Sequence, residues 1–304
     1  MQGFLRPFLV EKDKDKMIAL ARQSPADNLH VIDLPYRLSS WAMDEPNNVA
    51  VWSDEDHEII AWGVLQTPFW AIDYVCHPAA SSQLHAEILV WADERAQAII
   101  ESEFGHPAWY VMVFEEQKDR IHDLETLGYR CQEDVGENSW SQVLMCRSSD
   151  TAVRIYQPPT GFTVRSLAGE SDVEAYVALH QSVFESRNMT AGWRSRTIRH
   201  PAYTRELDIV VESPDGELVA FCIGWFDENS RDGQIEPLGC HKNFRHFALG
   251  RVALSECLHR LQSLGAKNIF VETDNYRNTA FRLYESFYFQ VVKKVLVYRK
   301  DFSP

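Results

Sequence analysis

The chemistry that stands out in this sequence is anion binding by residues 238–251, which read as a strand, a tight turn and the start of a helix. Such a turn directs several backbone N–H groups and a helix N-terminus at one point, which suits a pyrophosphate. The small residues Ala248 and Gly250 let an anion approach the backbone, and Arg245 and Arg251 add positive charge. An ordinary strand-to-helix turn with surface arginines explains the same letters, and this segment alone does not separate the two.

The helix that opens at this turn is expected over residues 249–264. Its apolar residues recur every three or four positions, as expected for one buried face: Leu249, Val252, Ala253, Cys257, Leu261 and Leu264. Gly265 stands where a helix C-terminus favours a left-handed residue. A strand is expected next, over 268–273, and a short helix over the segment that contains Tyr284. The turn is therefore framed by a strand before it and an amphipathic helix after it.

The same order of elements occurs twice in the chain. A predicted hairpin at 49–64 matches one at 209–223, with Ala61 and Ala220 159 positions apart (220 − 61). The strand ending at Cys76 matches the strand ending at Cys240, at an offset of 164 (240 − 76), and a helix and another strand follow each. Four matches in one order indicate an internal duplication. We therefore expect a mixed α/β fold (an α+β mixed sheet) in two tandem domains, 1–150 and 161–304, each a twisted mixed sheet flanked by helices.

Composition narrows the class of protein. The 304 residues contain 45% hydrophobic residues, enough for two cores, and the net charge of −14 argues against nucleic acid as the main partner. The six cysteines have no zinc-like spacing, so we expect no metal. No signal peptide begins at Met1 and no apolar run is long enough to span a bilayer, so we expect a cytoplasmic protein that binds no membrane. The oligomeric state is left open.

With these elements in place, the second half resembles the GNAT N-acetyltransferase superfamily. The resemblance lies in a strand, then Arg245-x-x-Ala248-x-Gly250, a helix, a strand, and Leu283-Tyr284-Glu285-x-x-x-Phe289. The duplicated layout is similar to tandem-domain members such as mycothiol synthase. The resemblance implies acetyl-CoA as the donor and a primary amine of a small molecule or peptide as the acceptor.

The resemblance also implies roles for particular residues. Leu238, Gly239 and Cys240 would pair with pantetheine. The pyrophosphate would lie on the loop formed by Arg245, His246, Phe247, Ala248, Leu249, Gly250 and Arg251. Tyr284 would face the leaving thiolate, and a phenol (unperturbed pKa about 10) is able to protonate a thiolate (about 8.5) at neutral pH. Packing beside Leu283 and Phe287 is the structural alternative for Tyr284.

The proton of the amine needs an acceptor, and two candidates lie near the pantetheine stretch. Glu236 would act directly or through a water, although Pro237 is expected to kink or bulge the strand there. His241 is the second candidate because its unperturbed pKa lies near neutrality. For the acceptor itself, Trp193 and Arg194 lie between the early helices, where this family shapes its acceptor site, and core packing explains them equally well.

Three departures from the family pattern bear on function. Alanine stands at 248 where the family usually has glycine, and a left-handed alanine costs about 1–2 kcal/mol, or roughly tenfold in affinity. Tyr288 replaces a glycine, and Arg277 stands where the family has an asparagine, so either Asn275 or Asn278 is the candidate contact to CoA. These departures also suit an alternative function, a non-catalytic sensor that binds acyl-CoA or a metabolite.

The first half lacks the corresponding chemistry. Alignment on Cys76 places Ser81 opposite Arg245, Leu84 opposite Ala248 and Ala86 opposite Gly250, while Leu124 stands opposite Tyr284. The arginine, the glycine and the phenol are all missing. We therefore expect a degenerate GNAT-like domain in the first half and the acyl-CoA site in the second.

Overall fold

The structure is a computed structural model that describes residues 3–275 and 278–303, and its chain divides into two compact units. Unit 1 contains Met1–Val143, Asp274–Tyr276 and Lys293–Pro304, and unit 2 contains Leu144–Thr273 and Arg277–Val292. The expected boundaries, 1–150 and 161–304, differ from this division at the C-terminal end. The reason is strand pairing: the last strand, β13 (Gln290–Asp301), pairs antiparallel with β5 (Ala108–Phe114) of unit 1, from Val295↔Phe114 to Asp301↔Ala108.

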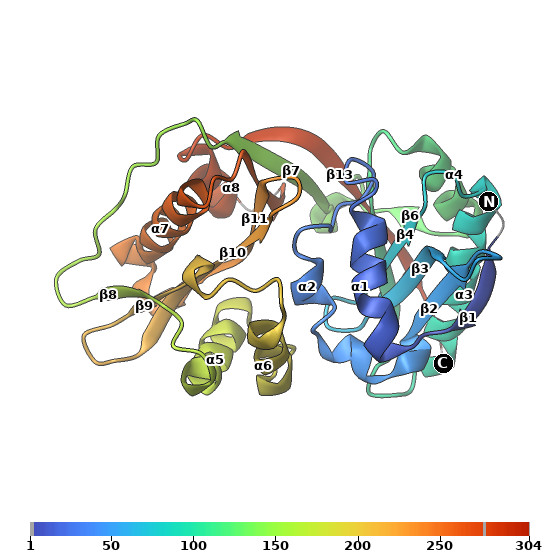
Figure 1. The fold of residues 1–304 in the computed structure, drawn as a ribbon, viewed down its shortest axis with the longest axis horizontal. Coiled ribbons are helices and arrows are strands. Elements are labelled where there is room, and N and C mark those ends of the chain that lie inside the picture. The colour runs from blue at the N-terminus through green and yellow to red at the C-terminus, as the bar shows by residue number, and fades with distance from the viewer. Residues whose placement is uncertain (1–2, 276–277, 304) are drawn as a thin grey trace. The chain divides into compact units, whose positions relative to one another are not determined.

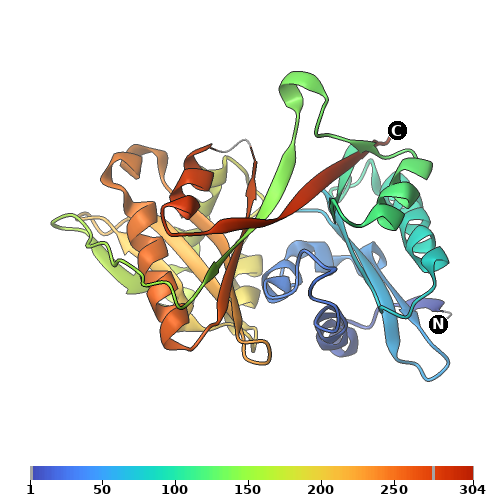
Figure 2. The same ribbon diagram turned by 90° about the horizontal axis from the view of Figure 1, so that it is seen from above.

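Unit 1 is a mixed sheet with helices on both faces. Its strand order is β1-β2-β3-β4-β5-β13, with β6 also paired to β13. The remaining strands are β1 (Phe4–Pro7), β2 (Val49–Ser53), β3 (Ile59–Gln66), β4 (Ala71–Cys76) and β6 (Arg130–Cys131). The helices are α1 (Val10–Ala21), α2 (Leu34–Arg37), α3 (Ser82–Ile99) and α4 (Lys118–Thr126). Figure 2 separates the two layers, with the blue α1 and α2 on one side of the strands and the teal α3 on the other.

Alternating side chains build a core on each face of the unit 1 sheet. Along β2, Val49 and Val51 pack with Met17 of α1, whereas Ala50 and Trp52 pack with Ile88 of α3. Both sets are apolar because a strand covered on both faces has no solvent side. The apolar runs in the sequence therefore become interior strands, as their composition predicts.

Unit 2 repeats this architecture. Its strands follow the order β7-β12-β11-β10-β9-β8. They are β7 (Ser141–Ser148), β8 (Thr163–Ser166), β9 (Asp208–Glu212), β10 (Leu218–Asp227), β11 (Asp232–Cys240) and β12 (Asn268–Asp274). The helices are α5 (Val173–Phe184), α6 (Ala191–Arg199), α7 (Leu249–Ser263) and α8 (Asn278–Glu285). In Figure 1, α7 and α8 lie on one side of this sheet, and α5 and α6 lie on the other.

The predicted duplication is reproduced at the level of strand register. Ala61 pairs with Cys76 in unit 1, and Ala220 pairs with Cys240 in unit 2. The next residue in each unit, His77 or His241, donates its backbone N–H back to the neighbouring strand, to Ile60 or Val219. The expected tandem repeat of two mixed α/β units is therefore confirmed.

A second repeated motif escaped the sequence comparison. In unit 1, Arg6 binds Asp13, and the Asp13 carboxylate accepts the N–H of Leu9 at 2.7 Å. In unit 2, Arg165 binds Asp172, which accepts the N–H of Ala168 at 2.8 Å. Both sets are separated by the 159 positions already seen for the hairpins (165 − 6 and 172 − 13). The pattern Arg-x6-Asp is present in both halves of the sequence.

Candidate functional site

The candidate site in unit 2 begins where two parallel strands separate. β11 and β12 pair from Asp232↔Asn268 to Ile235↔Val271, and among the described residues no β11 residue beyond Ile235 pairs with β12. On its other side, β11 stays paired with β10 through Leu238, Gly239 and Cys240. These three residues, predicted to bind pantetheine, therefore border an open wedge in the sheet. An extended chain with amide groups is able to hydrogen-bond to such an edge.

A bulge shapes the entrance to the wedge. Cys222 pairs with Leu238 and Gly224 pairs with Ile235, so Glu236 and Pro237 together lie opposite a single residue of β10. This confirms the expectation that Pro237 disturbs the strand, because proline has no N–H for the ladder. The backbone carbonyl of Glu236 accepts a 2.8 Å hydrogen bond from the indole of Trp225. The equivalent strand of unit 1, β4, passes the same point without a bulge, since Val64 pairs with Asp73 and Leu65 with Ile72.

The Glu236 carboxylate, predicted to be the general base, lies at the edge of a buried polar cluster. Burial raises the pKa of Tyr176. The charge of Arg194 opposes this rise, and the charges of Asp208 and Glu236 add to it. Arg194 itself is fully buried, forms an ion pair with Asp208, and lies 3.9 Å from the centre of the Tyr176 ring. The guanidinium therefore belongs to the core, and Arg194 is not a contact to an acceptor in this structure.

The predicted pyrophosphate loop is a 3-10 turn, residues Lys242–Phe247, followed by α7. Ala248, between them, has φ 56° and ψ 29°, the left-handed conformation anticipated for this position. Arg245, His246 and Phe247 are exposed, and the Arg245 side chain makes no hydrogen bond or ion pair with any part of the chain that the structure describes. The loop thus offers a free guanidinium beside the N-terminus of α7, where helical N–H groups have no partner within the helix.

His241 has a structural role in this turn. Its Nδ1 accepts the backbone N–H of Asn243 at 3.3 Å, which caps the 3-10 turn. The corresponding His77 accepts the N–H of Ala79 at 3.0 Å in the same way. Because the two units share this cap and only one has the phosphate-loop residues, the cap does not depend on the chemistry of the site. Glu236 is therefore the stronger candidate base.

Cys240 and Gly250 meet at the base of the loop. The N–H of Gly250 points at the Cys240 thiol, and a Cβ at Gly250 would lie 3.8 Å from that of Cys240. Burial raises the pKa of the Cys240 thiol, although the Gly250 N–H and the charge of Arg245 oppose the rise. Leu249, by contrast, points into the core and holds the start of α7 against the sheet.

Arg251 faces a different set of partners from the one predicted. Its guanidinium donates to the Ser286 hydroxyl at 2.9 Å and lies between the rings of Tyr156, at 5.2 Å, and Phe287, at 5.8 Å. These contacts tie α7 to the end of α8 and to the segment that precedes β8. A pyrophosphate contact by Arg251 stays a prediction, and it requires release of these partners.

Tyr284, the predicted proton donor, lies in α8 and is 94% buried, with 6% of its surface exposed. Its ring meets the ring of Phe289 edge to face, at 5.7 Å between centroids. Of the two candidate asparagines, Asn275 is bound to Ser141, through its N–H at 2.9 Å and its amide at 3.4 Å. Asn278 begins α8. The Asn278 side chain and the whole of Arg277 lie outside the described residues, so the contact from this segment stays a prediction.

Unit 1 fills the same positions with core residues. Leu84 and Leu124, opposite Ala248 and Tyr284, are 2% and 0% exposed and pack in one hydrophobic cluster. Ser81 precedes α3 without a side-chain cap and brings no positive charge. These residues support the expectation that unit 2, and not unit 1, carries the acyl-CoA site.

Comparisons with known proteins give a family match within unit 2 and a structural likeness over nearly the whole chain. Residues 174–289 match the profile of the acetyltransferase (GNAT) family. The sequence matches none of the curated proteins. Among solved structures, the chain is similar to a GCN5-related N-acetyltransferase from Sphaerobacter thermophilus, with 18% identity, a TM-score of 0.67, and coverage of 99% of this chain and 96% of that one.

Two further structures extend this likeness. One is a tandem GNAT protein from the clavulanic acid biosynthesis pathway, with 10% identity, a TM-score of 0.66, and coverage of 100% of this chain and 99% of that one. The other is the Saccharomyces cerevisiae N-myristoyltransferase with bound myristoyl-CoA, with 11% identity, a TM-score of 0.62, and coverage of 100% and 80%. At these identities the structures establish the fold alone.

The structural likeness extends over the whole chain, and the family match covers residues 174–289. The chain contains two GNAT-like units in tandem, and the region 174–289 carries the GNAT family match, as its motifs predicted. The family match indicates acyl transfer. Within the described residues, no helix is both long and apolar enough to cross a bilayer, and no group of three metal-binding side chains occurs.

Proposed function

We propose that unit 2 transfers an acetyl group from acetyl-CoA to a primary amine of a small molecule or peptide, in a direct ternary-complex reaction. The observation that carries this proposal is the wedge between β11 and β12 beside the left-handed turn at Ala248, in the segment that matches the GNAT family. Unit 1 is proposed to be a degenerate copy, because core leucines occupy its equivalent positions.

The residues present fit an acyl-CoA ligand. The open edge of Leu238, Gly239 and Cys240 matches the amide groups of a pantetheine chain. The exposed guanidinium of Arg245 and the N-terminus of α7 match the charge of a pyrophosphate. An added Cβ at Gly250 would make an ordinary van der Waals contact with the Cβ of Cys240, at 3.8 Å. When bound, acetyl-CoA supplies an activated thioester.

In the proposed reaction, residues of the chain transfer the protons. Glu236, at the bulge, accepts a proton from the ammonium group, directly or through a water, and leaves a neutral amine to attack. The backbone N–H groups at the wedge stabilise the negative charge that develops on the carbonyl oxygen. Tyr284, whose ring is buried, donates its phenolic proton to the departing thiolate, and the excess proton that the attacking nitrogen loses as the tetrahedral intermediate collapses restores the phenol. Glu236 thus acts at the start of the transfer and Tyr284 at its end.

The decisive experiment follows thiol release from acetyl-CoA with a panel of amines: amino sugars, polyamines, amino acids and peptide N-termini. Acceptor-dependent thiol release that falls about a hundredfold in Glu236→Gln supports the enzyme. Binding of CoA in calorimetry without thiol release from any amine favours the alternative, a sensor of acyl-CoA, and no binding at all overturns both. Arg245→Gln tests the loop separately, and it should weaken CoA binding about tenfold without changing the acceptor preference. The cytoplasmic location stays a prediction.

A further inference from the structure

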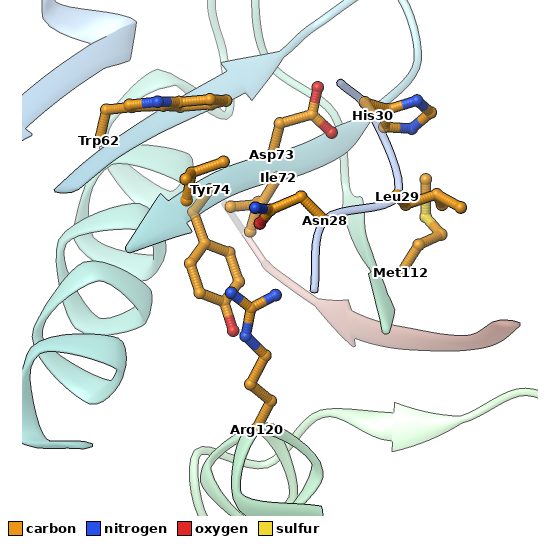
Figure 3. Close-up of a pocket in the computed structure, with 10 residues that line it drawn as sticks. Asn28, Leu29, His30, Trp62, Ile72, Asp73, Tyr74, Met112 and Arg120 are labelled. Atoms are coloured by element: carbon orange, nitrogen blue, oxygen red, sulfur yellow. The ribbon is translucent and has the colours of Figure 1, made fainter. Parts of the chain in front are cut away.

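Unit 1 also has a wedge, between β4 and β5, and different residues line it. Among the described residues, β4 and β5 pair only at Ala71↔Tyr110, and beyond that point β4 borders a cavity of about 40 Å³. Figure 3 shows the residues around it, which come from β3, β4 and β5, from the segment before α2, and from α4. Those that matter here are Asn28, His30, Asp73, Tyr74 and Arg120.

Arg120 brings a positive charge to this cavity. Its guanidinium lies 4.8 Å from the centre of the Tyr74 ring and donates to the backbone carbonyl of Asp27 at 3.3 Å. Among the described residues it forms no ion pair, including with Asp119 and Asp123 of its own helix. The other carboxylates near the cavity are engaged elsewhere: Asp73 accepts two hydrogen bonds from Arg37, at 2.7 and 2.9 Å, and Asp33 binds His30.

Two neutral groups beside Arg120 have hydrogen-bonding capacity to spare. The Asn28 amide donates to the carbonyls of Ser24, at 2.9 Å, and Ala21, at 3.4 Å, which turns its Oδ1 away from them. Asn28 and Tyr74 are each 7% exposed, and within the described chain neither Asn28 Oδ1 nor the Tyr74 hydroxyl has a hydrogen-bond partner. Burial raises the pKa of Tyr74 to about 12, so the phenol is a neutral donor. A buried group without a partner costs free energy until a ligand or water satisfies it.

We propose that this cavity binds a small carboxylate that carries a hydroxyl or ammonium group on the adjacent carbon. Arg120 and the Tyr74 hydroxyl donate to the carboxylate, and Asn28 Oδ1 accepts from the neighbouring group. Because the guanidinium covers the Tyr74 ring, Arg120 moves aside as the ligand enters and then binds it. Its single backbone hydrogen bond and ring contact offer little resistance to that movement.

The size of the cavity limits the ligand. About 40 Å³ holds roughly three water-sized spheres, which suits an acid of two or three carbons and excludes a CoA. The segment before α2 also lies across this wedge, since Gln117 donates to the Asp27 carbonyl at 2.9 Å. The site is therefore independent of the acyl-CoA site proposed for unit 2, and either proposal stands if the other fails.

Calorimetric titration of the full chain with glycolate, glycine and acetate tests the proposal. Glycolate or glycine should bind at least about threefold more tightly than acetate, which has no donor for Asn28. Arg120→Gln should weaken binding about tenfold or more, and Tyr74→Phe about three- to tenfold without lowering the thermal unfolding temperature, since its hydroxyl has no partner to lose. Arg130→Gln, at an exposed position of unit 1, is the matched control and should change nothing.

A crystal structure with glycolate provides the second measurement. The carboxylate is expected between Arg120 and Tyr74, with the ligand hydroxyl on Asn28. The proposal is overturned if none of the three acids binds saturably and the cavity holds only water. It is equally overturned if Arg120→Gln and Arg130→Gln bind the acids alike.

Discussion

The ring of Tyr284 meets the ring of Phe289 edge to face, with centroids 5.7 Å apart and planes 64° from parallel. The phenol ring is therefore held by aromatic packing, in a contact that does not involve its hydroxyl. Removing that hydroxyl alone should leave the ring in place. Tyr284→Phe consequently separates the two roles that the sequence left open, proton donor and packing residue.

We expect Tyr284→Phe to lower kcat about a hundredfold and to change the affinity for acetyl-CoA less than about threefold. The physical reason is that a proton donor acts on the leaving thiolate, whereas the ground state loses little. Steady-state kinetics and calorimetry measure the two effects. Tyr288→Phe, at an exposed tyrosine in the turn after α8, is the control. Equal losses in turnover and affinity would reassign Tyr284 to cofactor packing.

Ala248→Gly should change stability rather than affinity. Ala248 is left-handed in the chain without ligand, so its cost of about 1–2 kcal/mol is present in both the free and the bound protein. Glycine removes this strain, but its greater freedom in the unfolded state offsets about 0.5–1 kcal/mol, which leaves a net gain in stability of up to about 1.5 kcal/mol. The tenfold loss of CoA affinity expected from the sequence does not follow. Denaturant unfolding and CoA titration measure the two quantities, and Ala248→Val should destabilise the same position.

The stability of unit 2 should fall as the pH falls from about 6.5, in part because of His180. Burial, and then the charge of Arg194, lowers the pKa of His180 to about 3. The folded chain therefore keeps this imidazole neutral at a pH where the unfolded chain protonates it. The unfolded state binds more protons between the two pKa values, so stability rises with pH there and is lost on acidification, by up to about 1.4 kcal/mol per pH unit.

His180→Phe isolates this effect. The ring lies among Tyr176, Phe184 and Phe221, so an aromatic residue of similar size fits the position. Urea unfolding between pH 4 and 6.5 should show that the free energy of unfolding depends less steeply on pH. The difference in slope corresponds to about one proton fewer taken up on unfolding. His259→Gln, on the exposed side of α7, serves as the comparison. An unchanged slope in His180→Phe would contradict the assignment.

Neither half of the sequence should fold by itself. A fragment of residues 1–150 lacks β13, the partner of β5, and a fragment of residues 161–304 lacks β7, the neighbour of β12. Each would expose a long unpaired strand edge. We expect both fragments to give poorly dispersed NMR spectra when produced alone, and to copurify as a folded complex when residues 1–155 and 156–304 are produced together. Two independently folded halves would show that β13 is dispensable to unit 1.

The sequence allowed the repeat, the hairpins and the left-handed position at Ala248 to be predicted, because these depend on local patterns. Turn residues and apolar alternation act over a few residues, and the repeat is the recurrence of these local patterns 159 to 164 positions apart. The pairing of β13 with β5 could not be predicted in this way. An apolar strand with a two-residue period fits the edge of β5 or of β12 equally, and only long-range geometry chooses between them.

The contacts of charged side chains also could not be predicted from the sequence. Arg245 and Arg251 look alike in the sequence, yet one is exposed and the other lies between Tyr156 and Phe287. Arg194 was a candidate for contact with substrate, and it is a buried partner of Asp208. A charged residue carries no local sign of the partner it meets after folding, because that partner is set by the tertiary fold.

The placement of β13 also sets an order of events during synthesis. The ribosome releases β5 long before β13, since 176 residues separate them (290 − 114). At typical rates of about 5–20 residues per second, the N-terminal unit waits roughly 10–35 s with its β5 edge open. On a polysome, several nascent chains expose this edge at once, and a completed β13 from one chain is a suitable partner for another. Unit 1 is thus synthesised first, but its sheet is completed last. The β5 edge is most open to binding by chaperones during this interval.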